Sequence, residues 1–206
     1  MTQGQPRKRL DRRRELLRLG AERDGIFTAS AARVAGIPSS LLAYHARKGF
    51  IERIGREVYR VADFPPGPNE ALISAGVAFG DDAVISHESA LKLYGVSDVS
   101  PSQVHVTVPR SRRYLNARGN GVKVHTATRP FSRGEVVQYM GFSATSLARS
   151  IVDSARAHTA PEQIILAVTE GLRRGLVTTR QLERAFDGAP ERVRRFVQDG
   201  SQDLSP

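Results

Sequence analysis

Cysteine is absent from the 206-residue sequence. This absence excludes a disulfide framework, a thiolate zinc site and a cysteine nucleophile, and it is compatible with a reducing compartment. No apolar run reaches the roughly 18 residues that a membrane-spanning helix needs. The N-terminal stretch MTQGQPRKRLDRRR has no apolar segment after its basic residues, so it predicts no secretory signal. We therefore expect a cytoplasmic protein.

The usual marks of catalysis are also missing. The chain has four lysines, at positions 8, 48, 92 and 123, and none has an acidic residue two positions before it, which excludes an acidic-x-Lys nuclease pair. No Gly-rich phosphate loop and no G-x-S-x-G elbow occurs. The group SHES (86–89) is too local to form a catalytic triad, and helix capping explains its serine better. We expect no enzyme activity and no cofactor.

Histidines give no clear metal motif. His105 and His125 lie in the alternating segments VHVTV (104–108) and VKVHT (122–126), between valines that face the core. Alternation therefore places both on the outer face of a sheet, without carboxylates at a suitable spacing. We predict surface histidines and no metal site. For His45, a partly buried structural role is favoured over a base contact.

Positive charge is concentrated near the N-terminus. The net charge is +10, and residues 1–62 hold fourteen Lys/Arg against six Asp/Glu, whereas residues 63–206 hold seventeen against fifteen. A concentrated basic segment is typical of proteins that bind nucleic acid or anionic membranes. The alternative is a solvated surface in an arginine-biased protein, because arginine accounts for all but four of the basic residues.

The composition changes at ADFPPGPNE, where three prolines surround Gly67. Proline interrupts both strand ladders and helices, so this segment predicts a domain boundary. We expect a winged helix-turn-helix domain with a basic N-terminal arm in residues 1–64, a linker in 65–68, a second domain in 69–198 and a polar tail in 199–206.

The first domain shows the element order of a winged helix-turn-helix. Periodicity predicts helices over 10–23, from Thr28 or Ser30 to Val34, and over 38–48, followed by strands at 50–54 and 58–61. The link AGIP between the second and third helices is the short Gly-containing turn that such a unit needs. The whole chain is expected to be α+β.

The third helix is the predicted groove reader. With Leu42 and Ala46 facing inward, its outer face carries serine, tyrosine, arginine and lysine, which suit phosphates and base edges. A short amphipathic helix with a polar exposed face is the alternative. The predicted DNA contacts are Ser39, Ser40, Tyr44, Arg47 and Lys48 on this helix, Arg53, Arg56 and Arg60 on the hairpin, and Arg7, Lys8, Arg9, Arg12 and Arg13 on the basic arm.

The second domain is predicted to hold a small, mostly antiparallel sheet with helices grouped around it. The patterns predict strands near 83–85, 104–108, 122–126 and 136–139, and helices over 69–79, 86–94, 147–157, 161–174, 179–186 and 190–198. The basic loop PRSRRY (109–114) could contact DNA phosphates or an acidic partner, and a solvated loop explains it equally well.

The residues resemble a known family. GIFTASAARVAGIPSSLLAYHARKGFIERIGREVYRV (25–61) is similar to the winged-helix domain of AbiEi-type antitoxins. The segments ISHESALKLYGVSD, VHVTVPR, GFSATSLARSIVD and GLVTTRQLERAF resemble that family's C-terminal domain, so the likeness covers about residues 10–190. The family's wing carries Arg-Gly before Val-Tyr, whereas this chain has Arg56-Glu57.

The resemblance implies an antitoxin of a type IV toxin–antitoxin system. The winged helix would bind repeated sites in double-stranded DNA of its own promoter and repress the operon. The C-terminal domain would counteract a cognate AbiEii-type nucleotidyltransferase toxin. Two alternatives stay open, a stand-alone winged-helix transcriptional regulator and a basic protein–protein interaction module.

Overall fold

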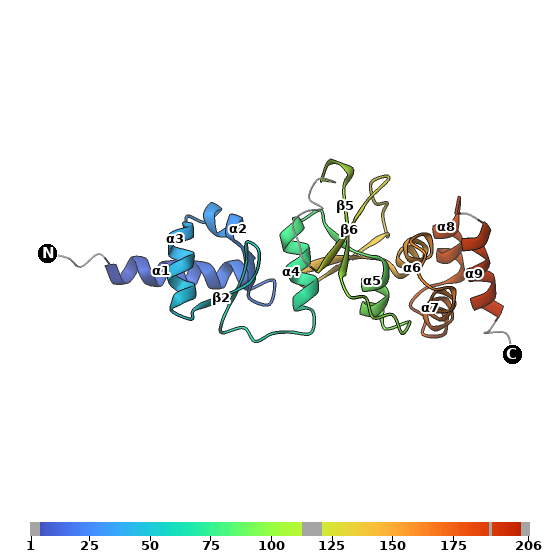
Figure 1. The fold of residues 1–206 in the computed structure, drawn as a ribbon, viewed down its shortest axis with the longest axis horizontal. Helices are drawn as coiled ribbons and strands as arrows, with labels where there is room; N and C mark the ends of the chain where they lie inside the picture. The colour runs from blue at the N-terminus through green and yellow to red at the C-terminus, as the bar shows by residue number, and fades with distance from the viewer. Residues whose placement is uncertain (1–4, 113–120, 190, 203–206) are drawn as a thin grey trace. The chain divides into compact units, whose positions relative to one another are not determined.

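The computed structural model describes residues 5–112, 121–189 and 191–202 (Figure 1). Their contacts divide the chain into two compact units. The first unit comprises the residues up to Asp81 together with Tyr139–Phe142, and the second comprises Asp82–Gln138 and the residues from Ser143 onward. The division falls at residues 81–82, after the helix that follows the proline-rich segment, rather than at residues 65–68.

The first unit is a winged helix-turn-helix with one added helix. Its three strands form an antiparallel sheet in the order β1-β3-β2, and the wing is the β2–β3 hairpin. The α+β class and the order of the predicted helices and hairpin strands are thereby confirmed, whereas strand β1 was not predicted. The elements are α1 (Gln5–Gly20), β1 (Ile26–Thr28), α2 (Ala29–Val34), α3 (Ser39–Arg47), β2 (Ile51–Gly55), β3 (Val58–Val61) and α4 (Glu70–Phe79).

Helix α1 begins earlier and ends earlier than predicted. Residues 5–9 continue the helix, so no extended arm precedes it among the residues that the structure describes. The chain leaves the helix at Gly20 and turns back at Gly25, which has a φ of 81°. A Cβ at Gly25 would lie 2.6 Å from the Cβ of Phe64, so only glycine fits this turn without movement.

The helix-turn-helix forms for local reasons. The hydroxyl oxygen of Thr28 accepts a hydrogen bond of 3.1 Å from the N–H of Ala31 and caps α2. Gly36, with a φ of 77°, reverses the chain between α2 and α3. Ile37 then enters the core of this unit, which consists of Leu16, Phe27, Ala29, Ala32, Ile37, Leu42, Ile51 and Val61.

The second unit contains a mixed sheet and five helices among the described residues. The strand order is β6-β5-β4-β8-β7. The elements are β4 (Val84–Ile85), α5 (His87–Tyr94), β5 (Val104–Val108), β6 (Val122–Thr126), β7 (Val136–Tyr139), β8 (Phe142–Thr145), α6 (Leu147–Arg156), α7 (Pro161–Arg173), α8 (Thr179–Phe186) and α9 (Glu191–Gln202).

The prediction of a mostly antiparallel sheet was wrong. Strand β4 pairs antiparallel with β5, but β4 with β8 and β5 with β6 are parallel pairs. Parallel neighbours need a crossover connection of about a dozen residues or more and cannot be joined by a tight hairpin.

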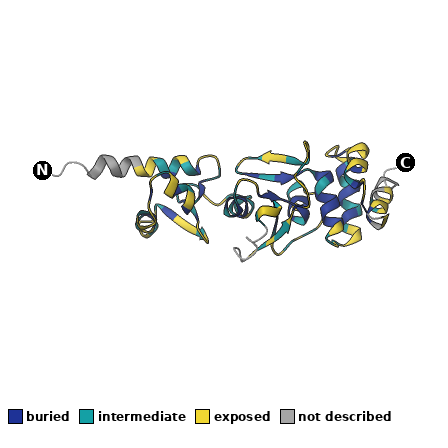
Figure 2. Ribbon diagram, turned by 90° about the horizontal axis from the view of Figure 1, so that it is seen from above, coloured by how far each residue is buried: buried dark blue, intermediate teal, exposed yellow. Residues whose placement is uncertain are grey.

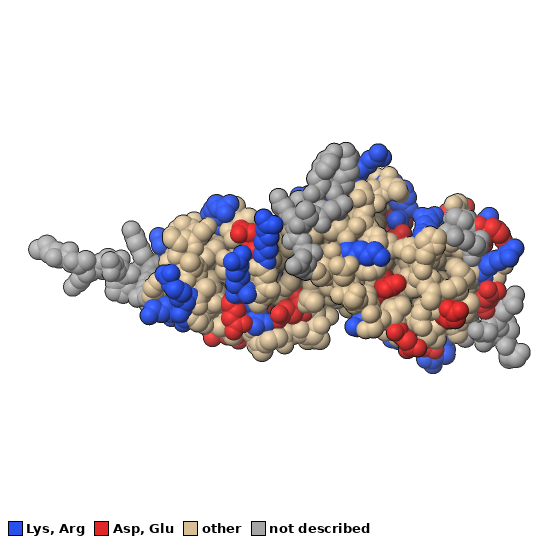
Figure 3. Space-filling model, in the orientation of Figure 1, with Lys and Arg blue, Asp and Glu red and all other residues tan. Residues whose placement is uncertain are grey.

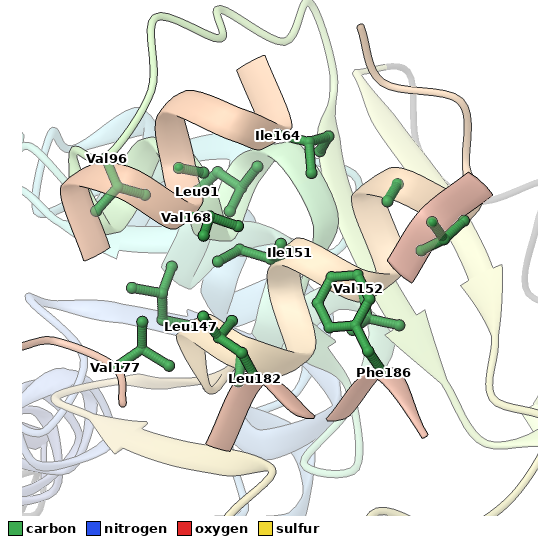
Figure 4. Close-up of a cluster of buried hydrophobic side chains, with 14 of the residues drawn as sticks. Leu91, Val96, Leu147, Ile151, Val152, Ile164, Val168, Val177, Leu182 and Phe186 are labelled. Atoms are coloured by element: carbon green, nitrogen blue, oxygen red, sulfur yellow. The ribbon is translucent and has the colours of Figure 1, made fainter. Parts of the chain in front are cut away.

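Helix α6 is the centre of the second unit's core. Eight of its ten residues are buried, including Leu147, Ile151 and Val152. Figure 4 shows these side chains meeting apolar side chains from α5, α7 and α8, among them Leu91, Val168, Leu182 and Phe186. Figure 2 shows the corresponding buried stretches along the ribbon. None of the helices in the described ranges is long and apolar enough to cross a membrane.

Candidate nucleic-acid interface

Helix α3 turns one face to the core and leaves a polar face exposed. Leu42 and His45 are buried, and Ala46 is half-buried, so the inward pair is Leu42 with His45 rather than with Ala46. The exposed residues of the helix and its C-cap include Ser39, Ser40, Arg47 and Lys48, as predicted. A protruding helix with these side chains has the donors that bind phosphates and the guanidinium that pairs with guanine.

His45 and Tyr44 anchor the helix from its inner side. His45 is fully buried, and its ring lies 5.4 Å from that of Tyr44 and 5.5 Å from that of Phe50, measured between centroids. His45 was predicted to be partly buried, whereas it is fully buried, and this burial supports the structural role predicted for it. Tyr44 was predicted to face outward, but it is half-buried and packs edge-on against His45. Only part of the Tyr44 ring is therefore presented to a ligand.

The N-terminus of α3 offers hydrogen-bond donors. Pro38 is its N-cap residue, and no side chain caps the helix. The first N–H groups of a helix have no intrahelical partner and attract anions. The hydroxyls of Ser39 and Ser40 are exposed at the same place. This end of α3 is suited to a phosphate.

The hairpin carries two exposed arginines and two exposed glutamates, one of which, Glu57, lies at the turn. Arg53 lies on β2, where its Nε donates a 3.3 Å hydrogen bond to the carbonyl of Gly55. Arg56 and Glu57 form the turn, and Glu57 has a φ of 60°. No ion pair of Glu57 exists among the residues that the structure describes. The wing tip therefore presents one cation and one carboxylate side by side.

Arg60 was predicted to contact DNA, and the structure contradicts this. Its side chain is 9% exposed and forms ion pairs with Glu52 on the neighbouring strand and with Glu70 on α4. Strand alternation turns Arg60 away from the face that carries Arg53, because Glu52 and Arg60 are cross-strand partners. Arg60 ties β2, β3 and α4 together and is not a free surface cation.

Helix α1 adds further basic residues. Arg12 and Arg13 are exposed, and the guanidinium carbon of Arg13 lies 4.7 Å from the centroid of the Phe50 ring. The predicted arm residues Arg7, Lys8 and Arg9 lie within α1, and their side chains are outside the described part of the structure. Arg33, an exposed residue on α2, was not among the predicted DNA contacts, although helical periodicity places it on the outer face of α2.

Exposed Lys and Arg side chains thus lie on α1, α2, α3 and the β2–β3 hairpin of the first unit. Figure 3 shows Lys and Arg side chains at several places on the unit that carries α3 and β2, with a few acidic side chains among them. A winged helix-turn-helix whose exposed third helix ends in Arg47 and Lys48 is the architecture of transcriptional regulators that read the major groove. The fold and this face resemble those of that class.

Comparisons with known proteins agree with this class. Residues 7–62 match the family described as "Transcriptional regulator, AbiEi antitoxin". The match agrees with the resemblance over the N-terminal domain, and it covers residues 7–62 only. The likeness of the later segments to the family's C-terminal domain stays a prediction.

A solved structure shares the fold over most of the chain. The crystal structure of the RV2827C protein from Mycobacterium tuberculosis aligns with this protein with a TM-score of 0.59 and 15% sequence identity. The alignment covers 91% of this chain and 76% of the RV2827C chain. At this identity the likeness shows the fold alone. No functionally curated protein matches the chain in sequence.

The second unit holds a histidine cluster that the sequence analysis missed. His105 is buried and His125 half-buried, so the prediction of two surface histidines was wrong. Both do lie on the sheet face opposite the valines, but His87 at the start of α5 covers that face, and the three rings meet there. Burial lowers the pKa of His87 to about 2 and that of His125 to about 4, and it lowers the pKa of His105 as well. All three are therefore neutral near pH 7.

Two other predictions for this region are settled only in part. Ser86 is the N-cap residue of α5, yet its hydroxyl makes no capping bond and instead contacts the Nδ1 of His87 at 2.8 Å. In the basic loop, Arg112 pairs with Asp82 at 3.4 Å. Arg113 and Tyr114 lie outside the described residues.

Proposed function

We propose that this protein is the antitoxin of a type IV toxin–antitoxin system and that it represses its own operon by binding promoter DNA. The proposal rests mainly on one observation, the exposed polar and basic face of α3 on a winged helix-turn-helix. The match of residues 7–62 to AbiEi antitoxin regulators supports the same role. The excess positive charge of residues 1–62 supplies the attraction to DNA that such a role needs.

The proposed DNA contacts fall into two groups, contacts to base edges and contacts to phosphates. Arg47 and Lys48 at the end of α3 read base edges in the major groove, where arginine recognises guanine in a bidentate manner. Ser39 and Ser40 with the helix N-terminus bind a phosphate and fix the register of the helix. Arg53 and Arg56 on the hairpin, with Arg12 and Arg13 on α1, add phosphate contacts that carry little sequence information.

The second unit has a different task in this proposal. It serves to counteract a cognate nucleotidyltransferase toxin. The protein acts in the cytoplasm and catalyses no reaction itself. The absence of a phosphate loop, a nucleophile elbow and an acidic-x-Lys pair from the sequence supports a non-enzymatic role. Cleavage of DNA by the purified protein in the presence of Mg²⁺ would contradict that part of the proposal.

A gel-shift experiment with the DNA upstream of the gene tests the DNA-binding role. Arg47→Ala should weaken binding to this DNA by about 1–3 kcal/mol, roughly 5- to 150-fold, and should reduce the preference over unrelated DNA. Arg180→Ala is the matched control, because Arg180 is an exposed arginine on α8 in the second unit. This control should bind like the unaltered protein.

Each outcome has a distinct meaning. Equal affinity of the unaltered protein for the upstream DNA and for any other duplex would refute repression through a specific operator. Equal effects of Arg47→Ala and Arg180→Ala would show that α3 does not read the groove. Specific binding without a nucleotidyltransferase gene beside this one would identify a stand-alone regulator, and an acidic protein partner that non-specific DNA fails to displace would favour an interaction module.

A further inference from the structure

Three imidazoles converge at one place in the second unit. His87 begins α5, His105 lies on β5, and His125 lies on the adjacent strand β6. One ring nitrogen of each residue lies within 4.8 Å of the others. The rings of His87 and His125 are stacked with centroids 3.5 Å apart, while His105 lies 5.1 Å from His125 and 5.8 Å from His87.

We propose that His87, His105 and His125 bind a divalent transition-metal ion of the zinc class. Neutral imidazole nitrogen is the protein ligand that suits zinc, copper, nickel and cobalt. Three histidines with a fourth position open to water are a recognised zinc arrangement. No carboxylate joins the cluster within the part of the chain that the structure describes, so the donor set excludes a calcium- or magnesium-type site.

Unpartnered ring nitrogens carry the proposal. The Nδ1 of His105 and the Nε2 of His125 are buried without a hydrogen-bond partner among the described residues, and His105 is only 6% exposed. Buried polar atoms are nearly always paired, so atoms without a partner in a native protein indicate an ion or water that the surroundings are built to hold. A metal ion would satisfy both nitrogens at once.

The surroundings of His87 fit a metal ligand. Its Nδ1 lies 2.8 Å from the hydroxyl of Ser86, which also accepts a 2.7 Å hydrogen bond from Thr107. Histidine ligands commonly use one ring nitrogen for the metal and donate the other N–H to such a partner, which fixes the ring and its tautomer. Ser86 therefore leaves the Nε2 of His87 for the metal.

The backbone at His87 is also held in an uncommon state. Its φ is 53°, in the left-handed region that non-glycine residues rarely occupy. Such strain is found where the surrounding structure requires a particular side-chain position. Here it places the ring at the start of α5 over the sheet face that carries His105 and His125, so the ion would fasten α5 to β5 and β6.

Binding needs a contraction of the cluster and a reorientation of its rings. With Zn–N distances of about 2.0–2.1 Å, tetrahedral geometry brings ligand nitrogens to roughly 3.4 Å from one another. The rings of His87 and His125 are stacked with their planes 15° apart, so at least one ring must rotate before both nitrogen lone pairs point at one ion. The neighbouring cations are Lys123, which is exposed, and Arg149, whose charge is balanced by Glu135 and Asp153.

Equilibrium dialysis of the full chain, purified without a histidine tag and stripped with EDTA, tests the proposal. We expect one Zn²⁺ per chain by elemental analysis, and Co²⁺ should give the visible absorption bands of nitrogen coordination. His125→Ala should lose this binding, and Ser86→Ala should weaken it about 10- to 100-fold. His158→Asn is the matched control, because His158 is exposed, outside the cluster, and has a φ of 65° that asparagine tolerates.

Thermal unfolding separates loss of a ligand from loss of the fold. Zn²⁺ should raise the Tm of the unaltered protein and of His158→Asn, whereas the Tm of His125→Ala should not respond to Zn²⁺. His125 is half-buried, and His125→Gln offers a second, polar replacement if the alanine variant does not fold. Less than one bound ion per chain, or equal binding by the unaltered protein and the His125 variants, would overturn the proposal.

Discussion

Arg60 shows how one residue can be misread from composition alone. It lies in a segment rich in arginine, on a hairpin that was predicted to touch DNA, and yet its guanidinium is buried between Glu52 and Glu70. Only the register of β2 against β3 reveals this, because Glu52 and Arg60 are directly opposite each other. Because of this pairing, Arg60 stabilises the fold and is not presented to DNA.

Replacing Arg60 should therefore destabilise the fold without a specific effect on DNA. Arg60→Ala should lower the free energy of unfolding by about 1–3 kcal/mol, less than for a fully buried pair because both carboxylates retain some solvent. Urea unfolding measures this. Arg53→Ala, an exposed arginine of the same hairpin, should change the stability by no more than about 0.5 kcal/mol. An equal loss of stability in both variants would contradict the assignment.

Glu57 is the second residue with an unexpected position. The family resemblance expects glycine here, and the φ of 60° explains why, since the left-handed region costs a residue with a side chain about 1–2 kcal/mol. The chain accepts this strain and places a carboxylate at the wing tip. If the wing approaches a phosphate backbone, that carboxylate opposes binding.

Removing the charge of Glu57 should strengthen DNA binding. Glu57→Gln keeps the size and backbone strain of the side chain but removes a repulsion of about 1 kcal/mol, so affinity at low salt should rise about two- to five-fold. Titration of labelled upstream DNA measures the change. Glu183→Gln, an exposed glutamate on α8, is the control and should bind unchanged. If Glu57→Gln binds no more tightly than this control, the wing does not reach the phosphates.

At the scale of elements, the sequence was most informative where periodicity was strong and uninterrupted. The bounds of β5, β6, β7 and α8 were predicted as the structure has them. Strand β8 was missed, because its four residues directly follow a turn and read as the approach to α6. The start of α1 was also misplaced, since its first residues are polar and carry no apolar stripe.

The fold prediction failed mainly where strands distant in the sequence pair with each other, and less in the bounds of single helices and strands. Nothing in the valine alternation of β5 and β6 indicates that the two strands run parallel. The same gap hid the histidine cluster, because His87, His105 and His125 come together only through this pairing and the placement of α5. The sequence did contain part of the evidence for the cluster, because strand alternation had already placed His105 and His125 on the same face of the sheet.

The segment before β7 is held to α6 through Glu135. The Nη2 of Arg129 lies 2.7 Å from one Glu135 oxygen, and the Nη1 of Arg149 lies 3.0 Å from it. Hydrogen bonds from Arg129, together with those from the N–H of Ser132 and from Arg149, lower the pKa of Glu135 to about 2. The folded protein thus favours the charged carboxylate.

Acid should therefore remove the contribution of Glu135. The lowered pKa means that its stabilisation is complete above the ordinary value of 4.5 and is lost as the pH falls through about 2. Relative to Glu135→Gln, the unaltered protein should be more stable at pH 7 by about 1–3 kcal/mol, a figure reduced for the solvent exposure of Arg129. Urea unfolding at a series of pH values measures the difference. A gap that stayed constant down to pH 2 would contradict this.

At the scale of the whole molecule, the positive charge is unevenly distributed along the chain. The N-terminal 62 residues carry most of the positive excess, while the remaining residues are close to balance. Non-specific attraction to DNA should consequently arise from the first unit. Since each neutralised phosphate releases bound counterions, the number of contacts can be counted from the dependence of affinity on salt.

Removing one cation of α1 should change that dependence by a defined step. Arg12→Ala should weaken binding to specific and unrelated DNA alike, and the slope of log affinity against log salt should fall by about 0.9 if one phosphate contact is lost. Fluorescence anisotropy over a salt series measures the slope. Arg156→Ala, an exposed arginine of the second unit, should leave it unaltered. Equal slopes for Arg12→Ala and the unaltered protein would show that α1 does not contact the backbone.

The ion pair between Arg60 and Glu70 also bears on where an expressed fragment of the first unit should end. Helix α4 packs against β1 and β3 and contributes buried side chains such as Ile73 and Phe79. A fragment that ends in the proline-rich segment would leave Arg60 with one carboxylate and expose apolar surface to solvent, which invites aggregation. Fragments intended for crystallisation with DNA should extend at least to Asp81, which omits only Tyr139–Phe142 of the first unit, although the composition of the sequence suggests an earlier end.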